Sequence, residues 1–121
     1  MIALMFGRDP IYSRFRHMPV GEFGLSSIVQ FELFFGAVNG DRREKSLAAL
    51  KKLRFETVPF DEHDAFRAGE IRAALKALGT PIGPYDVLIA GQALARDLTL
   101  VSRNIREFSR VDGLRVENWE G

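Results

Sequence analysis

The sequence predicts an α/β fold in which helices flank a parallel sheet. Segments that favour short strands alternate along the chain with longer helical segments, an order typical of βαβ units. Residues 98–101 are nearly all apolar, as expected of a strand buried on both faces. No Pro/Gly/Ser-rich linker interrupts the 121 residues, so a single domain, 1–121, is expected.

Turn and cap residues place the elements along the chain. Ser27 with Gln30 three residues later fits a capping box, and Asp61 is a good N-cap followed by Asp64 in the first turn. The apolar opening 1–6 is expected to be part of a core element whose beginning is missing. The expected elements are a helix from Asp9-Pro10, a strand at 23–25, a helix at 27–38, a helix from Asp41, a strand at 56–59, helices at 61–78 and 84–94, and strands at 98–101 and 114–117.

The composition of the chain excludes several kinds of functional site. The absence of cysteine excludes disulfides, thiolate zinc sites and cysteine nucleophiles. With a formal net charge of +1, any polyanion must be bound by a local patch rather than by the whole surface. No apolar run is long enough to span a membrane, and the opening lacks the features of a signal peptide. A cytoplasmic protein without a membrane partner is therefore expected.

Glu32 is the first candidate site residue, because it lies within an apolar helix. Between Ile28 and Val38 only Gln30 and Gly36 are otherwise not apolar. A carboxylate on such a surface loses hydration at a cost of several kcal/mol unless something compensates. A metal ion is one compensation; a salt bridge or a solvated helix edge is the alternative.

Asp86 makes the same case in the second apolar helix. Gly83-Pro84 fixes the approach of the chain, so Asp86 is expected to be held rigidly in the first turn. The alternative is that Asp86 only complements the helix dipole, which is worth about 0.3–1 kcal/mol.

A third polar cluster follows the strand at 98–101, where parallel sheets place their sites. Asn104 and Glu107 are suited to reach a metal directly or through water, and Arg103 and Arg106 to hold phosphate. A solvated polar loop is the alternative interpretation.

These residues carry a resemblance to a known family. The sequence closely resembles the PIN-domain ribonucleases of the VapC type, the toxins of bacterial toxin–antitoxin pairs. The most specific stretch is Gly79-Thr80-Pro81-Ile82-Gly83-Pro84-Tyr85-Asp86. The resemblance runs from about Gly21 to the end and includes 24–28, 31–33 with Gly36, 69–72, 86–91, 100–104, 106–108 and 111–119.

The resemblance implies a PIN-like (Rossmann-like) three-layer fold and an acidic site that holds Mg²⁺ or Mn²⁺. Glu32 takes the place of the family's second acid and Asp86 that of the third, while Asn104 and Glu107 lie in the region of the variable fourth. All four are predicted catalytic and metal-binding residues. The implied substrate is RNA, in particular tRNA, and the implied partners are a VapB-type antitoxin and a second copy in a homodimer.

The opening of the chain departs from the family pattern. The family begins with a strand ending in Asp-Thr-Asn, whereas Met1-Ile2-Ala3-Leu4 resembles the stretch after it. The first acid and the first strand are therefore expected to be absent, which weakens Mg²⁺ binding. The alternative function is a catalytically impaired protein that binds antitoxin or RNA without cleavage. A receiver-like or flavodoxin-like module is disfavoured, because no strand ends in a paired-acid or phosphate-loop motif.

Overall fold

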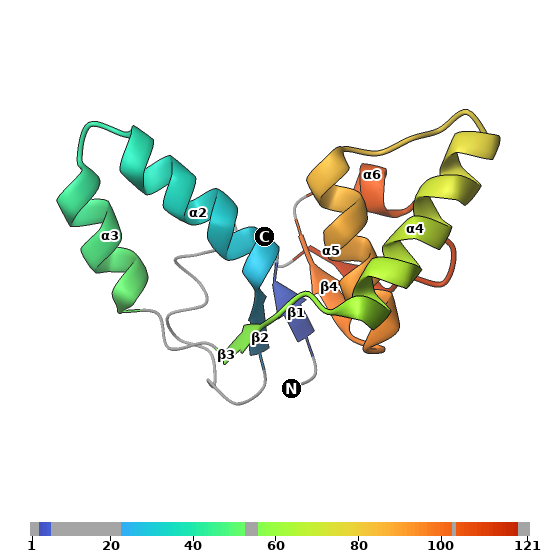
Figure 1. The fold of residues 1–121 in the computed structure, drawn as a ribbon, viewed down its shortest axis with the longest axis horizontal. Helices are drawn as coiled ribbons and strands as arrows, with labels where there is room; N and C mark the ends of the chain where they lie inside the picture. Colours follow the sequence, from blue (N-terminus) through green and yellow to red (C-terminus); the bar gives the residue numbers. More distant parts are fainter. Residues whose placement is uncertain (1–2, 6–22, 53–55, 103, 119–121) are drawn as a thin grey trace.

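A computed structural model of the chain describes residues 3–5, 23–52, 56–102 and 104–118. Within these residues the strands are β1 (Ala3–Met5), β2 (Phe23–Ser26), β3 (Glu56–Val58), β4 (Thr99–Val101) and β5 (Val116–Glu117). They form one parallel sheet in the order β3-β2-β1-β4-β5 (Figure 1). The predicted α/β class with a parallel sheet is thus confirmed, while the expected helix from Asp9-Pro10 lies outside the described residues.

The expectation of a missing first strand is wrong for the sheet itself. Strand β1 occupies the central position, where Leu4 is paired with Gly24 of β2 on one side and with Leu100 of β4 on the other. Its sequence, Ala-Leu-Met, is apolar throughout, which is the pattern of a strand in the middle of a parallel sheet. Asp9, the first acidic residue of the chain, lies outside the described residues, so the expected absence of the family's first acid stays a prediction.

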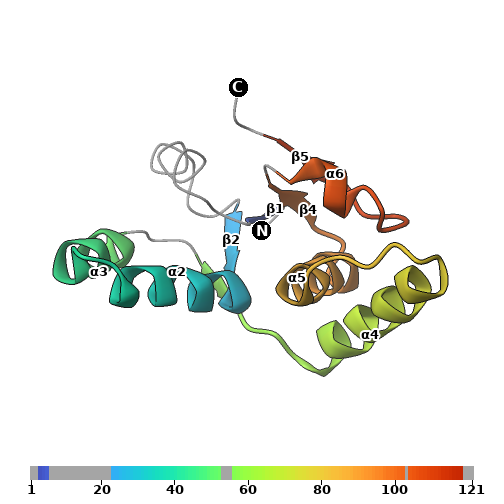
Figure 2. The same ribbon diagram turned by 90° about the horizontal axis from the view of Figure 1, so that it is seen from above.

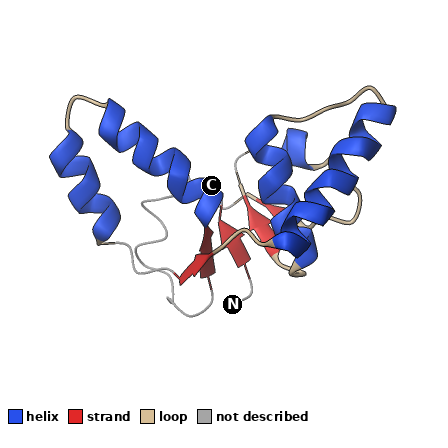
Figure 3. Ribbon diagram, viewed as in Figure 1, coloured by secondary structure: helices blue, strands red, loops and turns tan. Residues whose placement is uncertain are grey.

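The helices gather in two groups on either side of the central strand. They are α2 (Ser27–Asn39), α3 (Arg43–Lys51), α4 (Glu62–Ala77), α5 (Pro84–Ala95) and the short α6 (Ile105–Phe108). Helices α2 and α3 form a pair at one end of the molecule, whereas α4 packs on α5 at the other (Figures 2 and 3). No helix in these segments is both long and apolar enough to cross a membrane.

Helix α2 is capped one residue earlier than predicted. Ser26 is the N-cap, and its Oγ accepts a hydrogen bond from the Ile28 N–H at 3.1 Å. Ser27 instead accepts from the Phe60 N–H at 3.2 Å, and Gln30 donates to Thr57 Oγ1 at 2.8 Å. The two predicted capping residues therefore fasten α2 to the segment around β3. At α4 the predicted cap is confirmed, because Asp61 and Asp64 form a reciprocal capping box.

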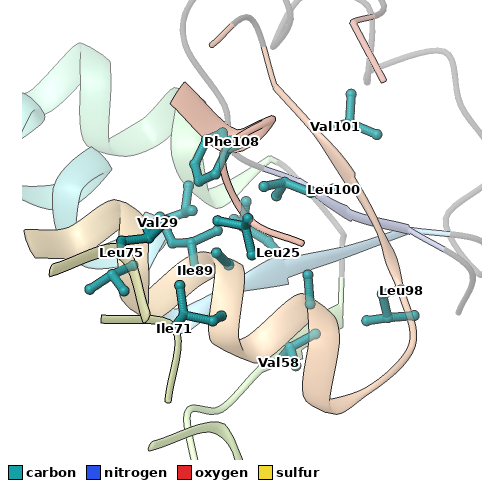
Figure 4. Close-up of a cluster of buried hydrophobic side chains, with 14 residues drawn as sticks. Leu25, Val29, Val58, Ile71, Leu75, Ile89, Leu98, Leu100, Val101 and Phe108 are labelled. Atoms are coloured by element: carbon teal, nitrogen blue, oxygen red, sulfur yellow. The ribbon is translucent and has the colours of Figure 1, made fainter. Parts of the chain in front are cut away.

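The core lies between the sheet and α5. Figure 4 shows Leu25 and Leu100 from the sheet meeting Ile89 of α5 and Phe108 of α6, and the last three of these side chains are completely buried. Residues from strands, α5 and α6 thus share one hydrophobic cluster. This packing fixes the start of α5 relative to α6, and it is there that the polar candidates meet.

Candidate functional site

Asp86 and Glu107 approach the same piece of backbone at Gly83. The Gly83 N–H donates to Glu107 Oε1 at 2.6 Å. A Cβ atom added to Gly83 would lie 3.0 Å from Asp86 Oδ2 and 3.6 Å from Glu107 Oε1. The two carboxyl groups are therefore neighbours, and the missing side chain of Gly83 leaves them the space.

Local structure explains how each carboxyl group arrives there. Pro84 is the first residue of α5, so Asp86 lies in its first turn, as predicted. Asn104 is the N-cap position of α6, directly after the sheet, and its N–H donates to the buried Ser102 Oγ at 3.0 Å. The Asn104 side-chain amide then donates to the Glu107 carboxylate. The carboxyl end of β4 thus delivers Asn104 and Glu107 to the start of α5.

The surroundings of Glu107 lower the pKa of its carboxyl group. Burial acts to raise the pKa of Glu107, but hydrogen bonds from the Gly83 N–H, the Asp86 side chain and Asn104, together with the charge of Arg110, outweigh burial and lower that pKa. At neutral pH Glu107 therefore presents a hard anionic oxygen donor beside Asp86.

Glu32 approaches this region from α2. The rings of Phe31 and Tyr85 lie 5.6 Å apart between centroids, which joins α2 to the start of α5. The residues that follow them in sequence, Glu32 and Asp86, are both partly buried, and Oε1 of Glu32 is itself buried. Within the described part of the chain, however, no three acidic or histidine side chains gather closely enough to hold a metal ion.

The structure therefore brings together three of the four predicted residues, namely Asp86, Asn104 and Glu107. Glu32 lies on the neighbouring helix and does not complete a group of three acids with Asp86 and Glu107. The four-residue metal site remains a prediction.

Two groups near the acid pair were not singled out from the sequence as contacts of Glu107. One is the Gly83 N–H, and the other is Arg110, which donates to the Pro81 carbonyl at 3.1 Å and lowers the pKa of Glu107. Arg110 follows Glu107 by three residues, just beyond the end of α6 at Phe108, so its charge lies close along the chain. The Gly83 contact joins residues 24 apart, and no local pattern indicates it.

The parallel sheet in the order β3-β2-β1-β4-β5, with acids at its carboxyl edge, agrees with a comparison against known families. The family described as "PIN domain" matches residues 2–114. The chain therefore belongs to the PIN-domain family, of the VapC type.

Relatives of known name support this finer placement. The chain is 43% identical over 97 residues to the "tRNA(fMet)-specific endonuclease VapC" of Salmonella typhimurium, which covers 78% of this chain and 74% of the relative. It is 39% identical over 98 residues to the "Ribonuclease VapC2" of Rickettsia felis, covering 79% and 73%.

Solved structures agree with the fold. A DNA-bound VapBC structure from Salmonella typhimurium superposes with a TM-score of 0.87 at 36% identity, covering 98% of this chain and 99% of the other. VapBC2 from Rickettsia felis, bound to a DNA fragment from the promoter, gives a TM-score of 0.83 at 32% identity over 98% and 99% of the chains.

Proposed function

We propose that this chain is an endoribonuclease toxin that hydrolyses RNA phosphodiester bonds and is neutralised by a VapB-type antitoxin. The observation that carries the proposal is the acid pair Asp86–Glu107 at the carboxyl edge of the sheet, held by Gly83 and Asn104. The relatives named ribonuclease or endonuclease support the activity, and the VapBC complexes support the antitoxin partner.

A tRNA substrate is the finer part of the proposal. Two relatives, from Salmonella typhimurium and Shigella flexneri, are named tRNA(fMet)-specific endonucleases, and the chain is 43% and 41% identical to them. An anticodon loop exposes bases and backbone that a duplex conceals, so a single-stranded loop is the part of tRNA a compact site can reach.

The donor set at the acid pair fits Mg²⁺ or Mn²⁺. Mg²⁺ prefers oxygen ligands and is often held by only one or two carboxylates, with water and substrate phosphate completing its shell. Asp86 and Glu107 supply two carboxylates, and Glu32 and Asn104 are the additional predicted ligands. A divalent cation bound there would supply Lewis acidity toward a phosphodiester.

The protein's own contribution is positioning. The Gly83 N–H and the Asn104 amide hold the Glu107 carboxylate in one orientation, and the first turn of α5 does the same for Asp86. Oxygen donors that are already fixed need no reorganisation when charge develops on the phosphate. Arg110 balances part of the negative charge of the pair.

Substitution of Asp86 tests this function. We expect Asp86→Asn to reduce cleavage of initiator tRNA by at least about 100-fold, because one anionic ligand is lost from a site that has few. Gel analysis of labelled tRNA in Mg²⁺ measures the rate, and Asp41→Asn, the same change at an exposed position between α2 and α3, is the control. Equal cleavage by both variants would remove Asp86 from the site.

A catalytically impaired binding protein is the second candidate function. One observation favours it: none of the three residues of the central strand β1, Ala-Leu-Met, is an acid, whereas the sites of parallel sheets lie at the carboxyl ends of their strands. On this account the chain binds antitoxin or RNA and cleaves weakly or not at all. Full activity of the 121-residue chain rules this candidate out. The homodimer stays a prediction, which light scattering on the purified chain would check.

A further inference from the structure

A cleft of about 570 Å³ lies between α4, α5 and the loop that joins them, outside the acid pair. Its floor is apolar and includes Pro81, Ile82 and Pro84 from the loop and the start of α5. One wall carries two cations of α4, Arg72 and Lys76. No function described so far uses this cleft.

The charged side chains that line the cleft are both positive. Arg72 and Lys76 are both exposed and stand four residues apart on α4, so their side chains lie on the same face one turn apart. No acidic residue lines the cleft, and the nearby Glu70 is paired with Arg67 at 3.2 Å. An anionic group attached to a flat apolar group is the ligand that complements such walls, and a nucleotide has this composition.

One loop contributes both to the cleft and to the surroundings of the acid pair. Ile82 and Pro84 line the cleft, and Gly83 between them donates to Glu107 and lies beside Asp86. In Figure 1 this loop joins the far end of α4 to the start of α5. The loop at 82–84 thus borders both the cleft and the acid pair, which makes the cleft the candidate place for a nucleotide next to one held at the acid pair.

We propose that this cleft binds the RNA nucleotide adjacent to the cleaved phosphodiester, with Arg72 and Lys76 on two backbone phosphates and the base against Ile82 and the two prolines. The inference rests on the proposed ribonuclease function and adds the place where the substrate strand is held. A second copy of the chain is the competing occupant, and the test below distinguishes it from RNA.

Binding of a labelled RNA at several salt concentrations tests the proposal. The probe is a fluorescein-labelled anticodon stem–loop, measured by anisotropy in EDTA so that binding is separated from Mg²⁺-dependent cleavage. The double variant Arg72→Ala/Lys76→Ala loses two phosphate contacts. The plot of the logarithm of the association constant against the logarithm of the salt concentration should therefore become shallower by about 1.4, and binding should weaken about tenfold near 0.15 M salt. The matched control is Lys51→Ala/Lys52→Ala, which removes the same charge from exposed positions at α3.

Cleavage kinetics give a second readout. The cleft variant is expected to raise KM about tenfold with kcat within about twofold, because the acid pair is untouched. Equal slopes and affinities for the cleft and control variants would overturn the inference, even if Asp86→Asn abolishes cleavage and the proposed function stands. If the wild type binds the RNA through Arg72 and Lys76 but never cleaves it, the proposed nucleotide site in the cleft is supported and the proposed nuclease activity is refuted. If light scattering shows a dimer that the cleft variant dissociates, a second copy occupies the cleft and the proposal is wrong.

Discussion

Arg96 joins three segments of the chain through its guanidinium group. It donates to both carboxylate oxygens of Asp64, at 3.2 and 3.1 Å, to Asp61 Oδ2 at 3.3 Å and to the Pro59 carbonyl at 2.9 Å. The hydrogen bond to Asp64 is the main cause of the raised pKa of Arg96, so the guanidinium stays charged. The end of α5 is thereby fastened to the start of α4 and to the residue after β3.

Removal of the buried Asp64 carboxylate should lower the free energy of unfolding. Asp64 is completely buried, so Asp64→Ala leaves a partly buried arginine without its main partner and the Asp61 N–H without its acceptor. We expect a loss of about 3 kcal/mol in the free energy of unfolding, measured by urea denaturation. Arg67→Ala breaks an exposed pair on the same helix and should cost less than about 1 kcal/mol. Similar losses in the two variants would contradict a structural role for Asp64.

At the scale of single residues, the sequence predicted contacts between near neighbours in the chain but not contacts between residues far apart in it. Asp61 as N-cap follows from its position before the helix, and the structure confirms it. Asp64 was taken for an ordinary first-turn acid, because its partner Arg96 is 32 residues away. The same limit applies to Glu107, whose orientation depends on the backbone of Gly83. The sequence indicates which side chains carry charge, and packing decides which of them meet.

Helices α4 and α5 pack closely at one glycine. A Cβ atom on Gly91 would lie 2.6 Å from the backbone Cα and N of Ala68, distances that real Cβ atoms do not show. The backbones of the two helices can approach this far only because position 91 has no side chain. This contact holds α4, with its buried Asp64 and its cationic cleft wall, against the helix that carries Asp86.

Gly91→Ala should therefore separate the two helices. The expected loss is about 2–3 kcal/mol in the free energy of unfolding, since backbone atoms cannot rotate away as a side chain would. Gly36→Ala in α2 is the matched control: a Cβ there meets nothing within 4 Å, and the better helix propensity of alanine should leave stability equal or raise it by up to about 1 kcal/mol. Thermal unfolding followed by circular dichroism compares the two. An unchanged midpoint for Gly91→Ala would show that the helices are not this close.

At the scale of elements, the existence of the helices followed from the sequence but their buried faces did not. Helix α2 is apolar almost all round, yet Phe31, Phe34, Phe35 and Val38 are all exposed. The large apolar side chains of Phe66 in α4 and Leu78 at its C-cap are 69% and 73% exposed, while the small Ala68 is buried. Apolarity alone does not say which face meets a neighbour; the close approach at Gly91 selects the face of α4 that carries small residues.

At the scale of the whole molecule, one short strand joins the two halves of the sheet. Strand β1 lies between β2 and β4, which are not themselves neighbours in the sheet. On one side are β2, β3, α2 and α3, and on the other are β4, β5, α5 and α6 (Figure 1). The sequence predicted that the family's first strand is absent, because the Asp-Thr-Asn motif is. Backbone pairing in a sheet needs only an extended apolar segment. Ala3–Met5 can therefore form the central strand without the aspartate of the family motif.

Interruption of this strand should affect the entire fold. Leu4→Pro removes a backbone donor from the middle of the sheet and adds a ring that a central strand does not accommodate, so we expect a loss of at least about 3 kcal/mol or of the cooperative transition itself. Leu4→Ile retains the N–H and favours a strand, and should unfold close to the wild type. Urea denaturation followed by tryptophan fluorescence and by circular dichroism reports whether both signals change together. If Leu4→Pro unfolds at the wild-type urea concentration, β1 does not hold the two halves of the sheet together.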